Sequence, residues 1–313
     1  MAATLLIAIA PAQAQDARHT FPVDQADNGG LTVEAARVAV RSAAEWLASG
    51  VDSWFGNTPF SEGGKVSDGQ IGLNVYSRQD QGGDVGVRFN ARFKLPNLEE
   101  QTYLFTGRDN WQGLITDKPA AFAAKQRLVQ SDTAADRSFV AGVGRFLGES
   151  TDVRVGFKDG LTLYAQGRYR HQWLLTDDDQ LEFSETFFLT TADRLGASTT
   201  FSYQHQFSPT MVARWLNAVT VSQVDPDAEW NGSLGAYRSM GQQRLLSLEL
   251  LASSKQRTGL ALTDYGVQVR WEQPVHQNRL LGEIMVGHFW PQSVAAGGRS
   301  TAWALGAGLK MSF

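Results

Sequence analysis

The chain has 313 residues, a mean hydropathy of -0.25, a formal net charge of -4 and no cysteine. These values exclude disulfides, thiolate metal sites and a strongly basic surface for nucleic acid. No stretch of about 20 uncharged apolar residues occurs, which excludes a bundle of membrane-spanning helices.

The first 14 residues predict a signal peptide. Leu5 to Ala10 form a short apolar run, and Ala12-Gln13-Ala14 fits the small-x-small pattern of a cleavage site. We expect cleavage after Ala14, so that the mature chain begins at Gln15 beyond the inner membrane.

Residues 15–30 are polar and predict a flexible N-terminus, and residues 31–66 predict an amphipathic helix with a linker. Thr32 is a suitable N-cap, and an apolar residue recurs every seven positions at Val33, Val40, Leu47 and Trp54. The opposite face has mixed charge at Glu34, Arg37, Arg41 and Glu45. This helix could plug a barrel or lie in the periplasm.

Residues 67–313 follow a different pattern, in which apolar and polar residues alternate with the period of a β-strand. About fourteen strands are expected, at residues 68–79, 83–95, 99–107, 137–147, 151–158, 161–173, 180–191, 195–207, 210–222, 229–239, 242–254, 261–272, 278–290 and 299–313. The fourth and ninth alternate less cleanly, so twelve strands are an alternative. Many reach the length that a tilted strand needs to cross a bilayer.

The two faces of these strands indicate a membrane barrel rather than a soluble sandwich or lipocalin-like barrel. The non-apolar face is rich in Gly, Ser, Arg and Gln, which would fill a soluble core poorly. Aromatic residues lie near strand ends, as at Trp173, Trp271 and Trp290. Such aromatic girdles mark the bilayer interfaces of barrels whose apolar face points to lipid.

The last strand alternates apolar residues and ends in an aromatic residue, at Leu309, Met311 and Phe313. It resembles the terminal strand of Gram-negative outer-membrane β-barrel proteins. The resemblance implies an all-β, antiparallel, up-and-down barrel in the bacterial outer membrane. It further implies that the barrel-assembly machinery reads this strand and that outer-membrane lipid surrounds the wall. It points to no specific member and transfers no function.

With the apolar face outward, the inner wall would carry many charged side chains. Its cationic positions are Arg88, Arg92, Lys94, Arg154, Lys158, Arg168, Arg170, Arg214, Arg270 and Lys310, and its acidic positions are Asp152, Glu182, Glu249, Asp264 and Glu283. Because charged pore walls set ion selectivity, this net-basic set predicts a passive channel or small-solute transporter that favours small anions. Loop 108–136 could fold inward as a constriction. Alternatively, the charges pair with one another and close the lumen.

Two further functions are alternatives to a channel. A non-conducting barrel could dock a periplasmic or membrane partner through its N-terminal helix. A weaker alternative is a lipid-acting enzyme that uses His288, but the sequence places no serine beside a carboxylate there. The sequence predicts no catalytic residue, metal site, cofactor or nucleic-acid partner, and it leaves the oligomeric state open. The acidic turn Asp177-Asp178-Asp179 is best interpreted as solvated.

Overall fold

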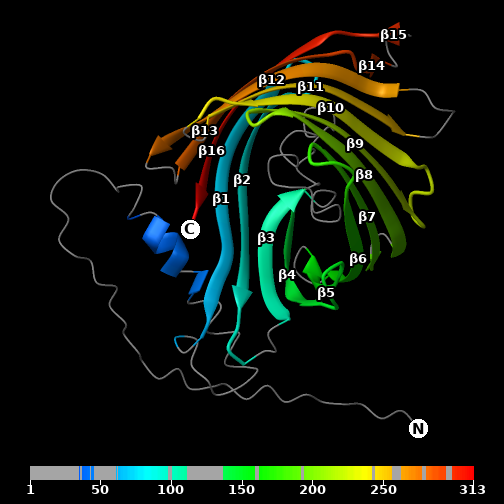
Figure 1. The fold of residues 1–313 in the computed structure, drawn as a ribbon. Helices are drawn as coiled ribbons and strands as arrows, with labels where there is room; N and C mark the ends of the chain where they lie inside the picture. The colour runs from blue at the N-terminus through cyan, green and yellow to red at the C-terminus, as the bar shows by residue number, and fades with distance from the viewer. Residues whose placement is uncertain are drawn as a thin grey trace. The chain divides into compact units, whose positions relative to one another are not determined.

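A computed structural model describes the strand-forming part of the chain and a short helix (Figure 1). The described residues are 35, 37–42, 44–45, 61, 63–97, 101–110, 137–158, 162–191, 194–241, 244–255, 262–276, 280–293 and 298–313. The predicted signal peptide, the predicted flexible N-terminus and most of loop 108–136 lie outside these residues.

Fourteen antiparallel strands close into one barrel, which confirms the predicted fold and excludes the twelve-stranded alternative. Except for the closing pair, each strand pairs with the barrel strands before and after it in the chain. They are β1 (Lys65–Arg78), β2 (Gly82–Lys94), β3 (Thr102–Asn110), β4 (Arg137–Phe146), β5 (Thr151–Lys158), β6 (Thr162–Leu174), β7 (Asp179–Thr190), β8 (Arg194–Ser208), β9 (Met211–Ser222), β10 (Glu229–Ser239), β11 (Leu245–Lys255), β12 (Leu262–His276), β13 (Leu280–Phe289) and β16 (Ala302–Ser312). A separate hairpin, which the sequence analysis did not anticipate, joins β14 (Gln292–Ser293) to β15 (Gly298–Arg299).

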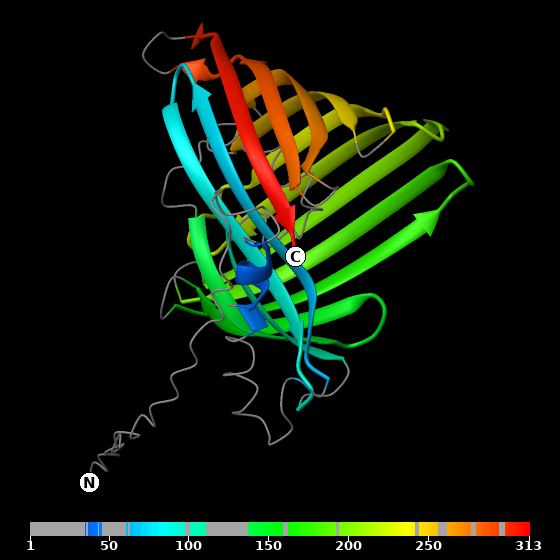
Figure 2. The same ribbon diagram turned by 90° about the vertical axis from the view of Figure 1, so that its left-hand side faces the viewer.

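The barrel closes between its first and last strands, which run side by side in Figure 2. The register pairs Gln70 with Ser312 at one end of this seam and Arg78 with Ala304 at the other. Phe313 continues the seam because its backbone N–H donates to the carbonyl of Gly69 at 3.0 Å. We call the end where β1 begins and β16 finishes the terminal end, and the opposite end the far end.

The connections between strands differ in length between the two ends of the barrel. At the terminal end they are short, as at residues 147–150 and 209–210. The far end has the longest connection, residues 111–136, and the segment that contains the β14–β15 hairpin. It also has the short turn that joins β1 to β2 through residues 79–81.

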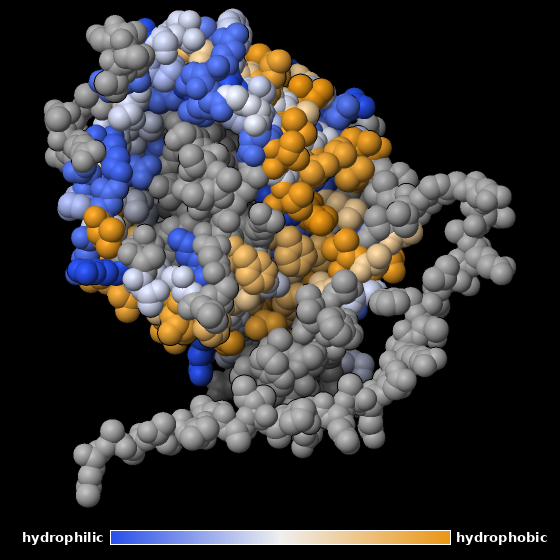
Figure 3. Space-filling view, turned by 180° about the vertical axis from the view of Figure 1, so that it is seen from behind, coloured by the Kyte–Doolittle hydropathy of each residue, from blue (hydrophilic) through white to orange (hydrophobic). Residues whose placement is uncertain are grey.

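The outer wall is apolar and exposed, as lipid contact requires. Val85, Ile284 and Leu305 expose 62%, 61% and 63% of their surface, whereas a soluble barrel would bury such side chains. Figure 3 shows hydrophobic residues gathered into a broad area of one face. The protein is therefore a transmembrane barrel whose apolar face points outward. The described helical residues form no segment long and apolar enough to cross a membrane.

Aromatic residues gather near both ends of the outer wall. At the far end, the ring of Tyr265 stacks on Trp290 with centroids 5.3 Å apart, and His288 lies 4.5 Å from Trp303. At the terminal end, His171 lies 4.5 Å from Trp173. These positions fit girdles at the two bilayer interfaces. The residues directly opposite His288 are Val267 on β12 and Trp303 on β16.

The described helical residues contact the outer wall. Ala44 is 2% exposed and belongs to an apolar cluster with Val66, Ala91, Phe93 and Leu95. The β2 members of this cluster continue the alternation of the lipid-facing residues of that strand, so they point out of the barrel. The helix therefore covers a strip of outer wall near the terminal end.

A glycine leaves room for an aromatic ring where β12 and β13 pair. Phe289 lies opposite Gly266, is fully buried and has the guanidinium of Arg78 4.6 Å from its ring centroid. A Cβ at position 266 would overlap this ring and also lie 2.7 Å from the carbonyl oxygen of His288. Glycine at position 266 therefore leaves the space that the Phe289 ring occupies on the inner wall.

We expect Gly266→Ala to lower the free energy of unfolding by about 1–3 kcal/mol, because the added methyl group overpacks a filled site. Gly167→Ala is the matched control, because a Cβ there meets nothing within 4 Å. Urea unfolding of both variants in lipid vesicles, followed by tryptophan fluorescence, measures the difference. Equal unfolding curves would contradict the packing described here.

Candidate functional site: the charged inner wall

The strand faces opposite the exposed apolar residues carry buried polar and charged side chains. In a barrel with a single wall, this second face is the interior. Among the predicted wall residues, the buried ones are Asp152, Arg154, Arg168, Glu249, Asp264 and Arg270. The charged side chains of the wall lie in four groups, each centred on a carboxylate or a guanidinium.

The first group surrounds Asp152 on the wall formed by β2 to β6. The side chain of Arg168 donates to both carboxylate oxygens, with Nε 2.9 Å from Oδ1 and Nη2 3.1 Å from Oδ2. Arg154 lies 3.1 Å from the same carboxylate and donates at 2.9 Å to the hydroxyl of Tyr103. The guanidinium of Arg92 stacks 4.8 Å from the Tyr103 ring. One carboxylate thus contacts two guanidinium groups, and Tyr103 links the third to them.

The second group joins β6, β7, β8 and β9 around Glu182. Arg170 lies 3.6 Å from one carboxylate oxygen and Arg214 lies 3.7 Å from the other. Arg214 also donates to the hydroxyl of Ser202 at 2.9 Å. This group again has more guanidinium groups than carboxylates.

The third group lies on β10 to β13 and is acidic. Glu249 is fully buried and accepts hydrogen bonds from the Tyr237 hydroxyl and, at 2.6 Å, from the side-chain amide of Gln268. Arg270 on the neighbouring strand lies 3.7 Å from Glu272 and 4.0 Å from Glu283. Three carboxylates therefore accompany one guanidinium.

The fourth group is at the far end, where β1, β12 and β13 meet. Arg78 is fully buried and contacts Asp264 at 2.6 Å and Asp80 at 2.7 Å. Its guanidinium also covers the ring of Phe289. This group, like the third, carries more negative than positive charge.

The four groups divide the inner wall into two arcs of opposite charge. The basic arc, on β2 to β9, contains Arg92, Arg154, Arg168, Arg170 and Arg214 with the acids Asp152 and Glu182. The acidic arc, on β10 to β13 and the end of β1, contains Arg78 and Arg270 with the acids Asp80, Glu249, Asp264, Glu272 and Glu283. Of the other predicted wall residues, Arg88, Lys158 and Lys310 are partly exposed and Lys94 is exposed.

Sequence reasoning missed several members of these groups. Arg78 and Glu272 lie in phase with inward residues of their strands, so the alternation could have identified them. Tyr103 and Tyr237 were missed because a tyrosine gives no sign from sequence that its hydroxyl will meet a charge on another strand.

The predicted assembly signal occupies the outer side of the seam. Phe313 stacks on Phe89 of β2, with ring centroids 6.1 Å apart and planes inclined by 14°, above Gly69. Met311 is 8% exposed and Leu309 is 44% exposed. Recognition of these residues by the assembly machinery remains a prediction.

The histidines and acids of the described residues form no cluster of metal ligands. Within this part of the chain, no three His, Cys, Asp or Glu side chains are grouped to hold a metal ion. His288 packs between Trp290 and Trp303 in the far-end girdle.

Several solved structures of outer-membrane proteins are similar in fold. A KdgM porin in complex with disordered oligogalacturonate aligns over 78% of this chain and 99% of its own, at 6% identity and a TM-score of 0.38. An anion-selective porin from Comamonas acidovorans aligns over 80% and 100%, at 9% identity and a TM-score of 0.45. The DcaP channel of Acinetobacter baumannii aligns over 80% and 98%, at 9% identity and a TM-score of 0.46. No protein-family model matches the chain, and no curated protein is similar to it by sequence. At these identities and with TM-scores below 0.5, the similarities carry no conclusion about this chain.

We expect Asp152→Asn to lower the free energy of unfolding by about 3–5 kcal/mol, because it removes the charge that Arg154 and Arg168 share in a buried setting. The exposed turn residue Asp177 provides the control Asp177→Asn, which should unfold like the parent. Denaturant titration of the folded barrel in detergent gives both values. An unchanged midpoint for Asp152→Asn would contradict this expectation and show that water in the lumen screens the interaction of Asp152 with Arg154 and Arg168.

Proposed function

We propose that the protein is a passive channel of the bacterial outer membrane for small solutes and that it favours anions. The observation that carries this proposal is the row of guanidinium groups on the basic arc. Barrels of eight strands fill their interior with side chains, whereas those of sixteen or more leave an aqueous channel. A fourteen-stranded barrel lies between these limits. Its terminal end would face the periplasm, as the resemblance of the last strand implies.

The separation of charge indicates how a solute would pass. An anion is attracted to the basic arc and repelled by the acidic arc, so its path follows β2 to β9. A solute with both charges would turn its positive group toward Glu272 and Glu283. Arg88, Lys94, Lys158 and Lys310 add positive charge to this inner wall and favour anions further.

A second candidate is a non-conducting barrel, and one observation favours it. Arg168, Glu249 and Arg270 are at most 3% exposed, as expected if ion pairs and hydrogen bonds fill the lumen. Such a barrel would serve as a structural or assembly partner. The contact of Ala44 with the outer wall then offers a place for a partner beside the terminal end.

Conductance in a planar bilayer separates these two candidates. The mature chain, starting at Gln15, is inserted under a salt gradient. Steady single-channel current with an anion-favouring reversal potential is expected. A folded barrel that carries no current would contradict the channel proposal and support the non-conducting barrel.

Wall variants test which charges set the selectivity. One unit charge about 4 Å from the ion path contributes about 1 kcal/mol in water. Each of Arg170→Gln and Arg214→Gln should therefore lower the anion permeability about fivefold and raise the cation permeability by about the same factor, so that the anion-to-cation permeability ratio falls. Glu283→Gln should raise it. Arg238→Gln is the control, because Arg238 is exposed and lies on the outward face of β10. A similar shift in this control would assign the effect to surface charge instead of the wall.

A further inference from the structure

A pocket on the outer wall combines an apolar floor with charged chemistry. This rim pocket has a volume of about 410 Å³ and lies near the terminal end, across β7 to β10. Its apolar part is formed by Phe207, Ala213, Trp215 and Leu234, and its polar part by Asp179, Tyr203 and His205. Phe207, Trp215 and Leu234 expose about half or more of their surface, so the pocket opens to the lipid side.

Three donors meet on the single carboxylate of Asp179 at the polar end. The hydroxyl of Tyr203 donates to Oδ1, and Nδ1 of His205 lies 2.7 Å from the same oxygen. The hydroxyl of Thr176, in the preceding turn, donates to Oδ2 at 2.6 Å. These bonds favour the ionised carboxylate and fix the imidazole, so that its other nitrogen is directed away from Asp179.

The charge around this pocket is negative. The adjacent turn adds Asp177 and Asp178, which are both exposed. Arg214 also lines the pocket, but its side chain lies on the inner side of the wall. There its guanidinium contacts Ser202 and Glu182. Arg238 is on the same outer face but does not line the pocket. Among the lining residues, the cationic group that could balance Asp179 on the outer side is therefore the imidazole of His205, and only when it is protonated.

Aromatic rings complete an environment that suits a cation. Tyr203, Phe207 and Trp215 surround the carboxylate end, and the His205 and Phe207 rings meet edge to face at 4.6 Å. The faces of aromatic rings attract ammonium groups, particularly where water is partly excluded. Beyond them, Ala213 leaves a depression between larger side chains that a hydrocarbon chain can fill.

We propose that the rim pocket binds a phospholipid with an ammonium headgroup. The ammonium group lies against Asp179, His205 and the aromatic rings, and an acyl chain lies over Ala213 between Trp215 and Leu234. The negative charge of the pocket disfavours an anionic headgroup. The site is separate from the inner wall, so it does not depend on whether the barrel conducts.

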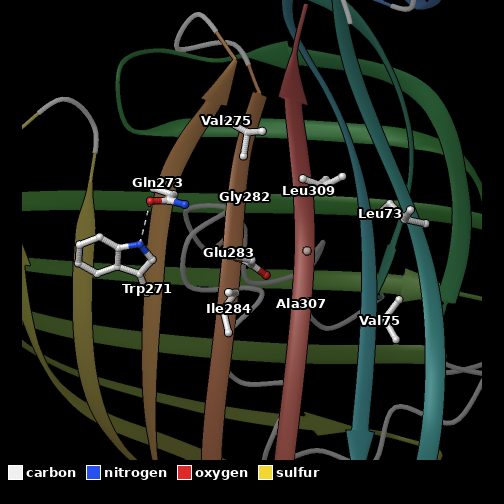
Figure 4. A pocket seen from close by; sticks show the side chains of 11 residues that line it. Leu73, Val75, Trp271, Gln273, Val275, Gly282, Glu283, Ile284, Ala307 and Leu309 are labelled. Carbon is white, nitrogen blue, oxygen red and sulfur yellow. Dashed lines mark hydrogen bonds between the residues drawn. The ribbon is translucent and has the colours of Figure 1, made fainter. Parts of the chain in front are cut away.

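A second pocket on the outer wall provides the comparison. This apolar pocket has a volume of about 350 Å³ and spans β12, β13, β16 and β1. Figure 4 shows Leu73, Val75, Ile284 and Leu309 around the small side chain of Ala307. Apart from Glu283, whose charge belongs to the inner wall, its polar group is Gln273, which accepts a hydrogen bond from the indole of Trp271 at 3.3 Å. It can hold a hydrocarbon chain but offers no charge to select a headgroup.

Native mass spectrometry of the full mature chain in detergent tests the proposal. The protein is titrated with phosphatidylethanolamine and, separately, with phosphatidylglycerol of the same acyl chains. We expect at least about tenfold tighter retention of phosphatidylethanolamine, which corresponds to about 1.4 kcal/mol. Equal retention of the two lipids would overturn the headgroup assignment.

Three variants locate the binding. Ala213→Trp fills the floor of the rim pocket and should abolish the preference, whereas Ala307→Trp fills the apolar pocket and should leave it unchanged. Asp179→Asn keeps an oxygen for Tyr203 and His205 but removes the charge, and should reduce the preference about tenfold. Heat-modifiable electrophoretic mobility verifies that each variant is folded. A preference that survives Ala213→Trp in a folded barrel would place the lipid elsewhere and overturn the proposal.

Discussion

The closure of the strands into one sheet is the constraint on which this structure depends. Hydrocarbon offers no partner to an unpaired peptide group, so a sheet can span the membrane only if it has no edge. The seam between β1 and β16 meets this requirement by joining strands from opposite ends of the sequence. Once the sheet is closed, each strand has one face toward lipid and one toward the interior. The chemistry of both faces follows from that division.

The outer and inner faces of the wall meet different physical requirements. The outer face needs apolar side chains, and where it carries a polar group near an interface that group is satisfied locally, as Asp179 is by three neighbours. The inner face can hold charge, but its side chains must pack within a narrow space. Glycine on one strand admits a ring from the next, and that ring supports a guanidinium, as Gly266, Phe289 and Arg78 show. Charged groups and backbone packing are therefore parts of one arrangement.

Much of the barrel could be predicted because alternation along a strand is a local property. The sequence placed all fourteen barrel strands to within a few residues and assigned Asp152, Arg154 and Arg168 to the same face. It could not show that one carboxylate joins these two arginines, because such contacts depend on register between strands. For the same reason it could not show that His205 contacts Asp179. The β14–β15 hairpin was missed because two-residue strands have too few positions to reveal a period.

The stack of Phe313 on Phe89 also determines where the polypeptide tolerates additions. The last residue is held by the β1–β2 hairpin across the seam, with its ring above Gly69. An affinity tag appended after Phe313 would disturb the contacts that this residue makes across the seam. The turn at residues 79–81, at the opposite end of the same hairpin, is exposed but also makes contacts, because Asp80 pairs with Arg78 and the side chain of Gln79 accepts a hydrogen bond from the backbone of Trp303. The carboxyl terminus is therefore best left native, and an insertion in that turn should keep Gln79 and Asp80.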